Sequence, residues 1–254
     1  NGLNPGDLKD QTIASVINQS MQTAYQCQQA GKIKQAESLY QKVLSIDPFH
    51  VNANHLLGVL YLQVQRFQLG IPLIRKAIIG KPDFKEAHSN LGLALFNIGL
   101  VVEATDCFRK AIEIDENYAE AYHNLGLALK KNDELESALS NLSKAIELNH
   151  EYATAHNSIA LIYQELGDTD KLIKHLRVAI DINPNFAVAY RHLASVKKYT
   201  EMDHYLTQME SLFASKKLPR NEAKHLAFGL GKIYEDFGQY DKSFEYYAIG
   251  NGVH

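Results

Sequence analysis

Two nearly identical nine-residue segments stand 34 residues apart in this chain. Ala-His-Ser-Asn-Leu-Gly-Leu-Ala-Leu occupies residues 87–95, and Ala-Tyr-His-Asn-Leu-Gly-Leu-Ala-Leu occupies residues 121–129. A segment that returns at a fixed spacing of roughly 20 to 50 residues is the sequence signature of a repeat protein. The pair therefore predicts a core that grows by stacking similar units, and a function that resides in a surface made by several copies.

The pattern continues on both sides of this pair. Residues 8–30 and 32–46 are predicted to form two helices, which Gly31 separates and Asp47-Pro48 closes, because proline cannot continue a regular helix. One unit is thus a helix, a glycine turn, a second helix and an Asp-Pro turn. The spacing predicts one array of about seven units: 17–50, 51–84, 85–118, 119–152, 153–186, an atypical 187–223, and 224–254, which is truncated by the end of the sequence.

The seventh and eighth places of successive units pair a large residue with a small one. The pairs are Leu57-Gly58, Leu91-Gly92, Leu125-Gly126, Ile159-Ala160 and Leu193-Ala194. A small residue lets two helices approach closely, so this place is expected to lie where the helices of a unit cross. With the recurring small residues at the twentieth and twenty-seventh places, the chain resembles the tetratricopeptide repeat (TPR) family. That resemblance implies an all-α TPR solenoid, a right-handed superhelix of antiparallel helix pairs whose first helices line a concave groove.

Two places depart from the repeat. Pro72, close to Gly70, predicts a kink in its helix or a late start to it. The unit at 187–223 is three residues longer than the others, so its second helix, expected over 202–215, should pack at a changed angle. That helix has an apolar stripe of Met202, Leu206, Met209 and Phe213.

The last predicted helix, over 240–249, has an apolar face that includes Phe244 and Tyr247. The final helix of a solenoid normally turns a polar face outward, because no further unit covers it. This face therefore predicts either a fragment of a longer protein or a partner at this end, which is a missing domain or a second copy.

The composition excludes several function classes. Of the 254 residues, 46% are hydrophobic and 22% are charged, and the net charge is −3. We therefore expect neither nucleic acid nor membrane as a partner, and the sequence has no signal-peptide pattern. Cys27 and Cys107 occupy different places of the repeat, which favours free thiols in a reducing compartment and a cytoplasmic location.

The first helices present places two, five, six, nine and thirteen to the groove. A side-chain amide can donate and accept hydrogen bonds, so asparagines at these places can pair with the main chain of an extended peptide. The alternative is that the same amides have partners within the protein. In two units the Asn-Leu-Gly run is similar to the asparagine ladder in the repeats of O-linked N-acetylglucosamine transferases. The candidate peptide-binding residues are Asn90, Asn124, Asn157, His123, Leu93, Leu127, Leu161 and Arg191.

Other site chemistries are disfavoured. Chaperone-binding members of the family hold a carboxylate with an asparagine at place nine, where this chain has Val59, Leu93, Leu127 and Leu161. The histidines that recur about once per unit occupy different places, so they are not expected to converge on a metal. Gly229-Leu230-Gly231-Lys232 lacks the spacing and the preceding strand of a phosphate-binding loop. We expect no catalytic residue, no metal and no cofactor.

One further resemblance concerns the final repeat. Residues 225–251, which include Leu230-Gly231 and Tyr234, look like the last repeat of bacterial proteins in which TPR units precede a sulfotransferase domain. The sequence thus predicts a scaffold that binds a peptide or protein segment in its groove. The alternative is the non-catalytic, substrate-recruiting region of a larger enzyme. A sulfotransferase is the preferred identity of that enzyme, and a glycosyltransferase is the second choice.

Overall fold

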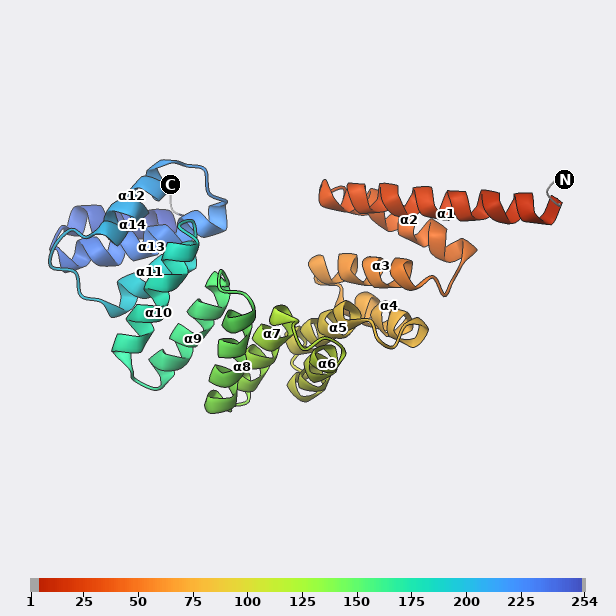
Figure 1. Ribbon diagram of the computed structural model, residues 1–254. Coiled ribbons are helices and arrows are strands. Elements are labelled where there is room, and N and C mark those ends of the chain that lie inside the picture. Colours follow the sequence, from red (N-terminus) through yellow and green to blue (C-terminus); the bar gives the residue numbers. More distant parts are fainter. Residues whose placement is uncertain (1–4, 253–254) are drawn as a thin grey trace. The chain divides into compact units, whose positions relative to one another are not determined.

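The computed structural model describes residues 5–252, and the side chains of residues 11–252. The described residues form fourteen α-helices and no strand (Figure 1). The chain divides between Asn132 and Asp133 into two compact units. This division falls between the two helices of the predicted repeat 119–152, and the single continuous array remains a prediction. The first unit holds α1 to α7 and the second holds α8 to α14.

The helix bounds follow the predicted spacing. The first unit contains α1 (Pro5–Gln29), α2 (Ile33–Ile46), α3 (Val51–Gln63), α4 (Phe67–Gly80), α5 (Lys85–Asn97), α6 (Val101–Ile114) and α7 (Ala119–Lys131). The second contains α8 (Leu135–Leu148), α9 (Ala153–Glu165), α10 (Thr169–Ile182), α11 (Ala187–Val196), α12 (His204–Ala214), α13 (Arg220–Asp236) and α14 (Tyr240–Asn251).

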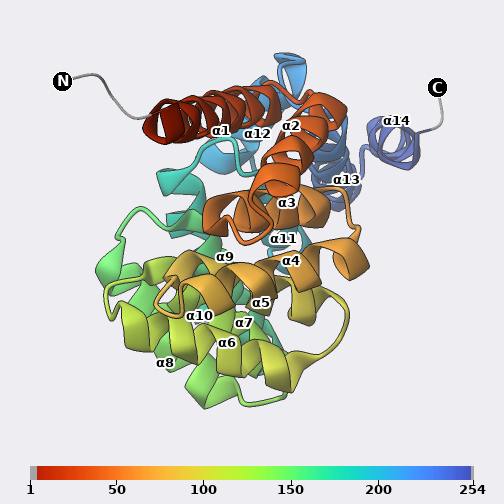
Figure 2. The same cartoon turned by 90° about the vertical axis from the view of Figure 1, so that its right-hand side faces the viewer.

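Consecutive helices pack as pairs: α1 with α2, α3 with α4, and α5 with α6 in the first unit, as Figures 1 and 2 show, and α9 with α10 and α13 with α14 in the second. This arrangement confirms the predicted all-α fold of the TPR type.

The turn inside each helix pair has a backbone geometry that repeats with the sequence. Gly31, Gly99 and Gly167 have φ values of 70°, 87° and 74°, in the left-handed region that glycine adopts without steric cost. Gln65 and Asp133 occupy the same place with φ values of 59° and 65°. The place is therefore set by the turn itself, and glycine is the residue that fits it best.

The turns after α2, α6, α8 and α10 are each fixed by a side chain, whereas α4 has Lys81 at this place. Asp47, Asp115, Asn149 and Asn183 each end a second helix and accept a hydrogen bond from the backbone N–H two residues further on. Such Asx turns give the chain an alternative to further helix, because the side-chain oxygen replaces a helical carbonyl. The predicted stop at Asp47-Pro48 is confirmed, and in two later units an Asx turn forms without a proline.

The small residue at place eight lies where the two helices of a unit cross. A Cβ added to Gly92 on α5 would lie 2.6 Å from Cε1 of Phe108 on α6, which is closer than real Cβ contacts. Phe108 is fully buried, together with Ala104 and Ala111 on the same helix. The Leu-Gly pair was predicted to hold the helices together, and this contact confirms its packing role.

Pro72 does not delay the start of its helix. α4 begins at Phe67, 34 residues after the start of α2 at Ile33, so the prediction of a late start is wrong. Pro72 is the sixth residue of α4, beyond the first turn, and Gly70 just before it is buried against Leu62 and the Gly58 carbonyl of α3. Packing against α3 keeps this helix in register despite the lost backbone donor.

The atypical unit departs from the repeat further than the sequence predicted. α11 ends at Val196, whereas α3, α5 and α9 each run for 13 residues. α12 spans His204–Ala214, not 202–215, and Met202 is 57% exposed, so it does not belong to the apolar stripe. Leu206 and Met209 are buried as predicted. α11 packs extensively on α13 and only slightly on α12.

A polar network fixes the segment that follows α11. Asp236 on α13 accepts hydrogen bonds from the Tyr199 backbone N–H and from Lys232. Lys232 also donates to the Lys197 carbonyl at 2.9 Å. Burial raises the pKa of Asp236, but these donors and the Lys232 charge lower it more, so the net shift is downward. The carboxylate thereby fixes the irregular backbone between α11 and α12.

The last helix keeps an exposed apolar face. Phe244 on α14 is 75% exposed, and Tyr240 is exposed as well, while Tyr247 packs against Gly231 and Ser243 donates to the Gly231 carbonyl. Gly231 therefore lies at the crossing of α13 and α14, as Gly92 does at the crossing of α5 and α6. The helix before α14 begins at Arg220, four residues ahead of the predicted start of the unit near Lys224. Among the described residues, every helix is too short or too polar to cross a membrane.

Candidate binding surfaces

A hollow lies in the first compact unit, between α3 and α5, which are the first helices of two successive repeats. Its volume is about 570 Å³. The lining side chains on α5 are spaced three and four residues apart, so they share one face of the helix. The lining consists of Val59, Leu62, Gln63, Gln65, Phe67, Asn90, Leu93, Ala94 and Asn97.

The hollow has an uncharged lining. Amide side chains stand beside an aliphatic wall to which Val59 and Leu93 contribute, and neither a carboxylate nor a cationic group is among the lining residues. Amides offer donors and acceptors without a net charge. Such a lining suits a main chain with an apolar side chain better than it suits a charged group.

Asn90 is tied to the neighbouring first helix. Its Nδ2 lies 3.0 Å from Nε2 of His55 on α3. Burial lowers the pKa of His55, with a smaller opposing contribution from the charge of Glu86, so the ring is neutral near pH 7 and Nε2 accepts the bond. The Asn90 amide therefore has one partner inside the protein and still lines the hollow.

The other two candidate asparagines make equivalent links. Asn124 is 7% exposed and donates to Ser89 Oγ at 3.5 Å, and Asn157 is 9% exposed with Oδ1 3.0 Å from His192 Nδ1. All three links join residues 35 apart, between place six of one first helix and place five of the preceding one. Asn124 and Asn157 thus have the intramolecular partners that the alternative interpretation required, and their part in peptide binding remains a prediction.

The remaining candidates are divided between the two compact units. His123 and Leu127 on α7 are half-buried in the first unit, and burial lowers the pKa of His123. Leu161 on α9 is half-buried in the second unit, where the exposed Arg191 on α11 lies 5.3 Å from the Phe228 ring. Of the eight predicted residues, only Asn90 and Leu93 line the hollow of the first unit.

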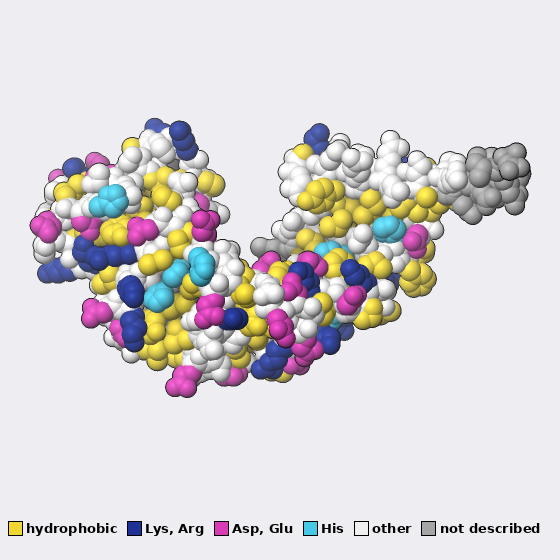
Figure 3. Space-filling model, viewed as in Figure 1, with side chains coloured by type: hydrophobic (Ala, Val, Ile, Leu, Met, Phe, Trp, Pro, Cys, Tyr) yellow, Lys and Arg dark blue, Asp and Glu magenta, His cyan; other side chains and the backbone are white. Residues whose placement is uncertain are grey.

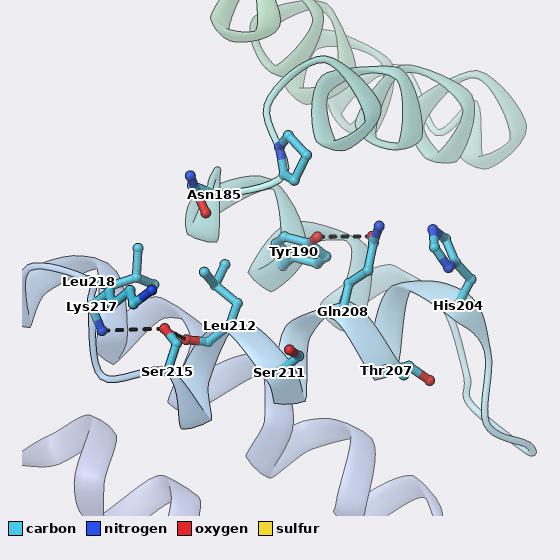
Figure 4. A pocket seen from close by; sticks show the side chains of 11 residues that line it. Asn185, Tyr190, His204, Thr207, Gln208, Ser211, Leu212, Ser215, Lys217 and Leu218 are labelled. Carbon is cyan, nitrogen blue, oxygen red and sulfur yellow. Dashed lines mark hydrogen bonds between the residues drawn. The ribbon is translucent and has the colours of Figure 1, made fainter.

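A second hollow, of about 620 Å³, lies beside α12 in the second unit (Figure 4). One face of α12 forms most of its wall, the turn before α11 and the segment after α12 complete it, and Tyr190 lies in its middle. The repeat pattern does not predict this site, although the three extra residues of the atypical unit mark the segment that forms part of it. It is lined by Pro184, Asn185, Tyr190, His204, Thr207, Gln208, Ser211, Leu212, Ser215, Lys217 and Leu218.

The part of the chain that the structure describes contains neither a metal-binding cluster nor a disulfide bond. No group of three or more His, Cys, Asp or Glu side chains there could hold a metal ion. Both cysteines are free, and burial raises the pKa of Cys107 to about 11, so its thiol is protonated near neutral pH. On the face shown in Figure 3, acidic and basic side chains intermingle over α5 and α6.

Family profiles match the middle of the chain, from residue 102 to residue 186. Profiles described as TPR repeat match residues 102–133 and 132–167, and a profile described as tetratricopeptide repeat matches residues 153–186. Residues 102–186 therefore carry tetratricopeptide repeats. The last match coincides with the predicted unit 153–186. No curated protein sequence matches the chain.

Solved structures similar to these repeats include three informative ones. A crystal structure of MamA is 28% identical, with a TM-score of 0.57, and covers 63% of this chain and 94% of its own. YrrB, described as a TPR protein with an unusual peptide-binding site, is 23% identical, with a TM-score of 0.55, over 67% of this chain and 88% of its own. PilF of Pseudomonas aeruginosa is 16% identical, with a TM-score of 0.67, over 91% of this chain and 98% of its own. At these identities, YrrB and PilF support the fold alone.

Proposed function

We propose that this TPR chain is a protein-interaction scaffold that binds an extended peptide or protein segment along its first helices. The observation that carries the proposal is the uncharged hollow between α3 and α5, where Asn90 and Leu93 lie together. Amides beside an aliphatic wall can pair with a peptide main chain and accommodate an apolar side chain. The description of YrrB as a peptide-binding TPR protein is consistent with this class of ligand.

The proposal includes a role for each part of the hollow. Leu93 and Val59 would contact an apolar side chain of the ligand, while Asn90, Gln63 and Asn97 would pair with its main chain. Asn124, Asn157, His123, Leu127, Leu161 and Arg191 stay candidates for further contacts. We expect no enzymatic activity and no cofactor for this chain, and neither nucleic acid nor membrane as a partner.

The test is capture of bound peptides by the isolated chain, followed by mapping of the bound segment and titration of it against variants. Leu93→Asp places a charge in the hollow and is expected to weaken binding by about ten-fold or more, because an uncompensated charge would be desolvated by the ligand. Leu69→Asp makes the same change at an exposed position of α4 outside the hollow, so it should leave affinity unchanged. Equal binding by both variants and the parent chain would contradict the proposed site.

A second proposal rests on the resemblance of residues 225–251 to repeats that precede a sulfotransferase. In it, the chain is the substrate-recruiting region of a larger cytoplasmic enzyme, with a sulfotransferase preferred over a glycosyltransferase. The exposed Phe244 and Tyr240 on α14 then contact another domain or a second copy. The comparisons above give this proposal no support. The coding sequence downstream of His254 tests it: a strand followed by a phosphate-binding loop would favour the enzyme, and a stop codon or another repeat would exclude it.

A further inference from the structure

The hollow beside α12 differs in charge from the one on α3 and α5. Its lining includes Lys217 and His204 but no aspartate or glutamate. Lys217 is exposed and, within the described part of the chain, makes no ion pair, whereas Lys197 and Lys232 of the same unit are paired with Asp203 and Asp236. The hollow therefore presents at least one uncompensated positive charge to a ligand.

The apolar part of this hollow lies between its two basic residues. In Figure 4, Tyr190 and Leu212 stand in the middle, with Lys217 and Leu218 at one end and His204 at the other. Tyr190 is 1% exposed, so it forms a fixed floor. Its hydroxyl donates to Gln208 Oε1 at 3.1 Å, and the other end of that amide carries N–H donors.

The length of the hollow fits a short stretch of extended chain. Its wall runs along α12 from His204 to Ser215, which at about 1.5 Å per residue is roughly 16 Å. An extended peptide advances about 3.3 Å per residue, so the wall spans roughly five residues. An open site of this length suits a peptide better than a compact ligand.

We propose that the α12 hollow binds an extended acidic peptide. An apolar side chain of the peptide packs on Leu212 and Leu218, and a carboxylate of the peptide pairs with Lys217. Thr207, Ser211 and Gln208 supply polar groups along the wall. This site is independent of the uncharged hollow in the first compact unit. It belongs to the atypical repeat, and it recognises a negatively charged peptide, whereas the lining of the other hollow is uncharged.

The test is selection of heptapeptides from a random display library on the whole chain, followed by fluorescence anisotropy with the enriched, labelled peptides. The expected result is a class of peptides that carries an apolar residue and at least one Asp or Glu. Lys217→Glu should weaken their binding by about ten-fold or more, and Leu212→Asp should weaken it at least as much. Binding should also weaken as salt is raised, because exposed ion pairs are screened.

Two variants serve as matched controls. Lys216→Glu makes the same charge change at the adjacent residue, which does not line the hollow, and Leu93→Asp alters only the first unit. Both should bind the acidic peptides as the parent chain does, with circular dichroism confirming that all four variants are folded. Three results would overturn the proposal: no enrichment of acidic residues, equal losses for Lys216→Glu and Lys217→Glu, or a dimer of the chain that Leu212→Asp dissociates.

Discussion

At the scale of single residues, the Asn-Leu-Gly run at 90–92 holds a glycine with a packing role and an asparagine that contacts another repeat. The role of Gly92 could be predicted from the sequence, because the need for a small residue at a helix crossing depends only on the repeat itself. The environment of Asn90 could not, because its partner His55 lies in another unit and occupies a place where other units have Ser89 or Asn157. Periodicity identifies which side chains share a face, but it does not identify what each one contacts.

Enlarging Gly92 is expected to destabilise the first unit. In Gly92→Leu the new side chain would overlap the buried Phe108 ring. Overpacking typically costs about 1 to 3 kcal/mol, and the middle of that range exceeds the roughly 1 kcal/mol gained in helix propensity. Urea unfolding followed by circular dichroism measures the change in the free energy of unfolding.

Phe108→Ala provides the control for this variant. It leaves space where the ring was, so the double variant Gly92→Leu with Phe108→Ala should be less destabilised than the sum of the two single variants. Additive effects would mean that Leu at this position does not meet Phe108, which would contradict the predicted overlap.

At the scale of helices, the bounds of the regular pairs could be predicted to within a few residues. Each pair repeats the same turn geometry, and the Asx turns at Asp47 and Asp115 close the second helices. The atypical unit could not be predicted so well, because the early end of α11 depends on the Asp236 network from α13. The hollow beside α12 follows from that irregularity, so no repeat pattern could have located it.

One helix pair is coupled by two histidines. His156 on α9 and His175 on α10 lie with their Nδ1 atoms 3.0 Å apart, and the ring of Tyr163 stacks on His175. Burial lowers the pKa of His156. Burial first, and then the charges of His156 and Lys174, lower the pKa of His175 to about 4. Both rings are therefore neutral near pH 7, where one Nδ1 donates and the other accepts.

The stability of the second unit is expected to fall in mild acid. An unfolded histidine has a pKa near about 6.5, so the unfolded state binds protons that the folded pair resists. The contribution of the pair is fully present above about pH 6.5 and is lost as the pH falls toward the folded pKa of His175, about 4. Thermal melting from pH 7 to pH 5 should show a decreasing melting temperature, and His175→Gln should show a smaller decrease.

The matched control for the pH effect is His150→Gln, which changes an exposed histidine in the turn before α9. It should keep the pH dependence of the parent chain. If His175→Gln and the parent lose stability equally between pH 7 and pH 5, the coupled pair does not contribute to the acid sensitivity.

At the scale of the whole molecule, the repeats predict how a local change spreads. Each unit of a solenoid contacts only its neighbours, so stability is close to a sum of unit and interface terms. A substitution in one repeat is therefore expected to destabilise nearby repeats more than distant ones. The chain has no tryptophan, so one introduced residue reports on one place at a time. Phe96 on α5 and Tyr205 on α12 are half-buried aromatic positions in the two compact units.

Gly92→Leu is therefore expected to affect the two units unequally. In urea titrations followed by tryptophan fluorescence, the midpoint reported by Phe96→Trp should fall at least twice as far as the midpoint reported by Tyr205→Trp, because the substituted helix crossing belongs to the first unit. Each reporter variant without Gly92→Leu supplies its own reference midpoint. Equal shifts at both positions would mean that the chain unfolds as one cooperative body, and that its proposed binding hollows cannot be destabilised independently of each other.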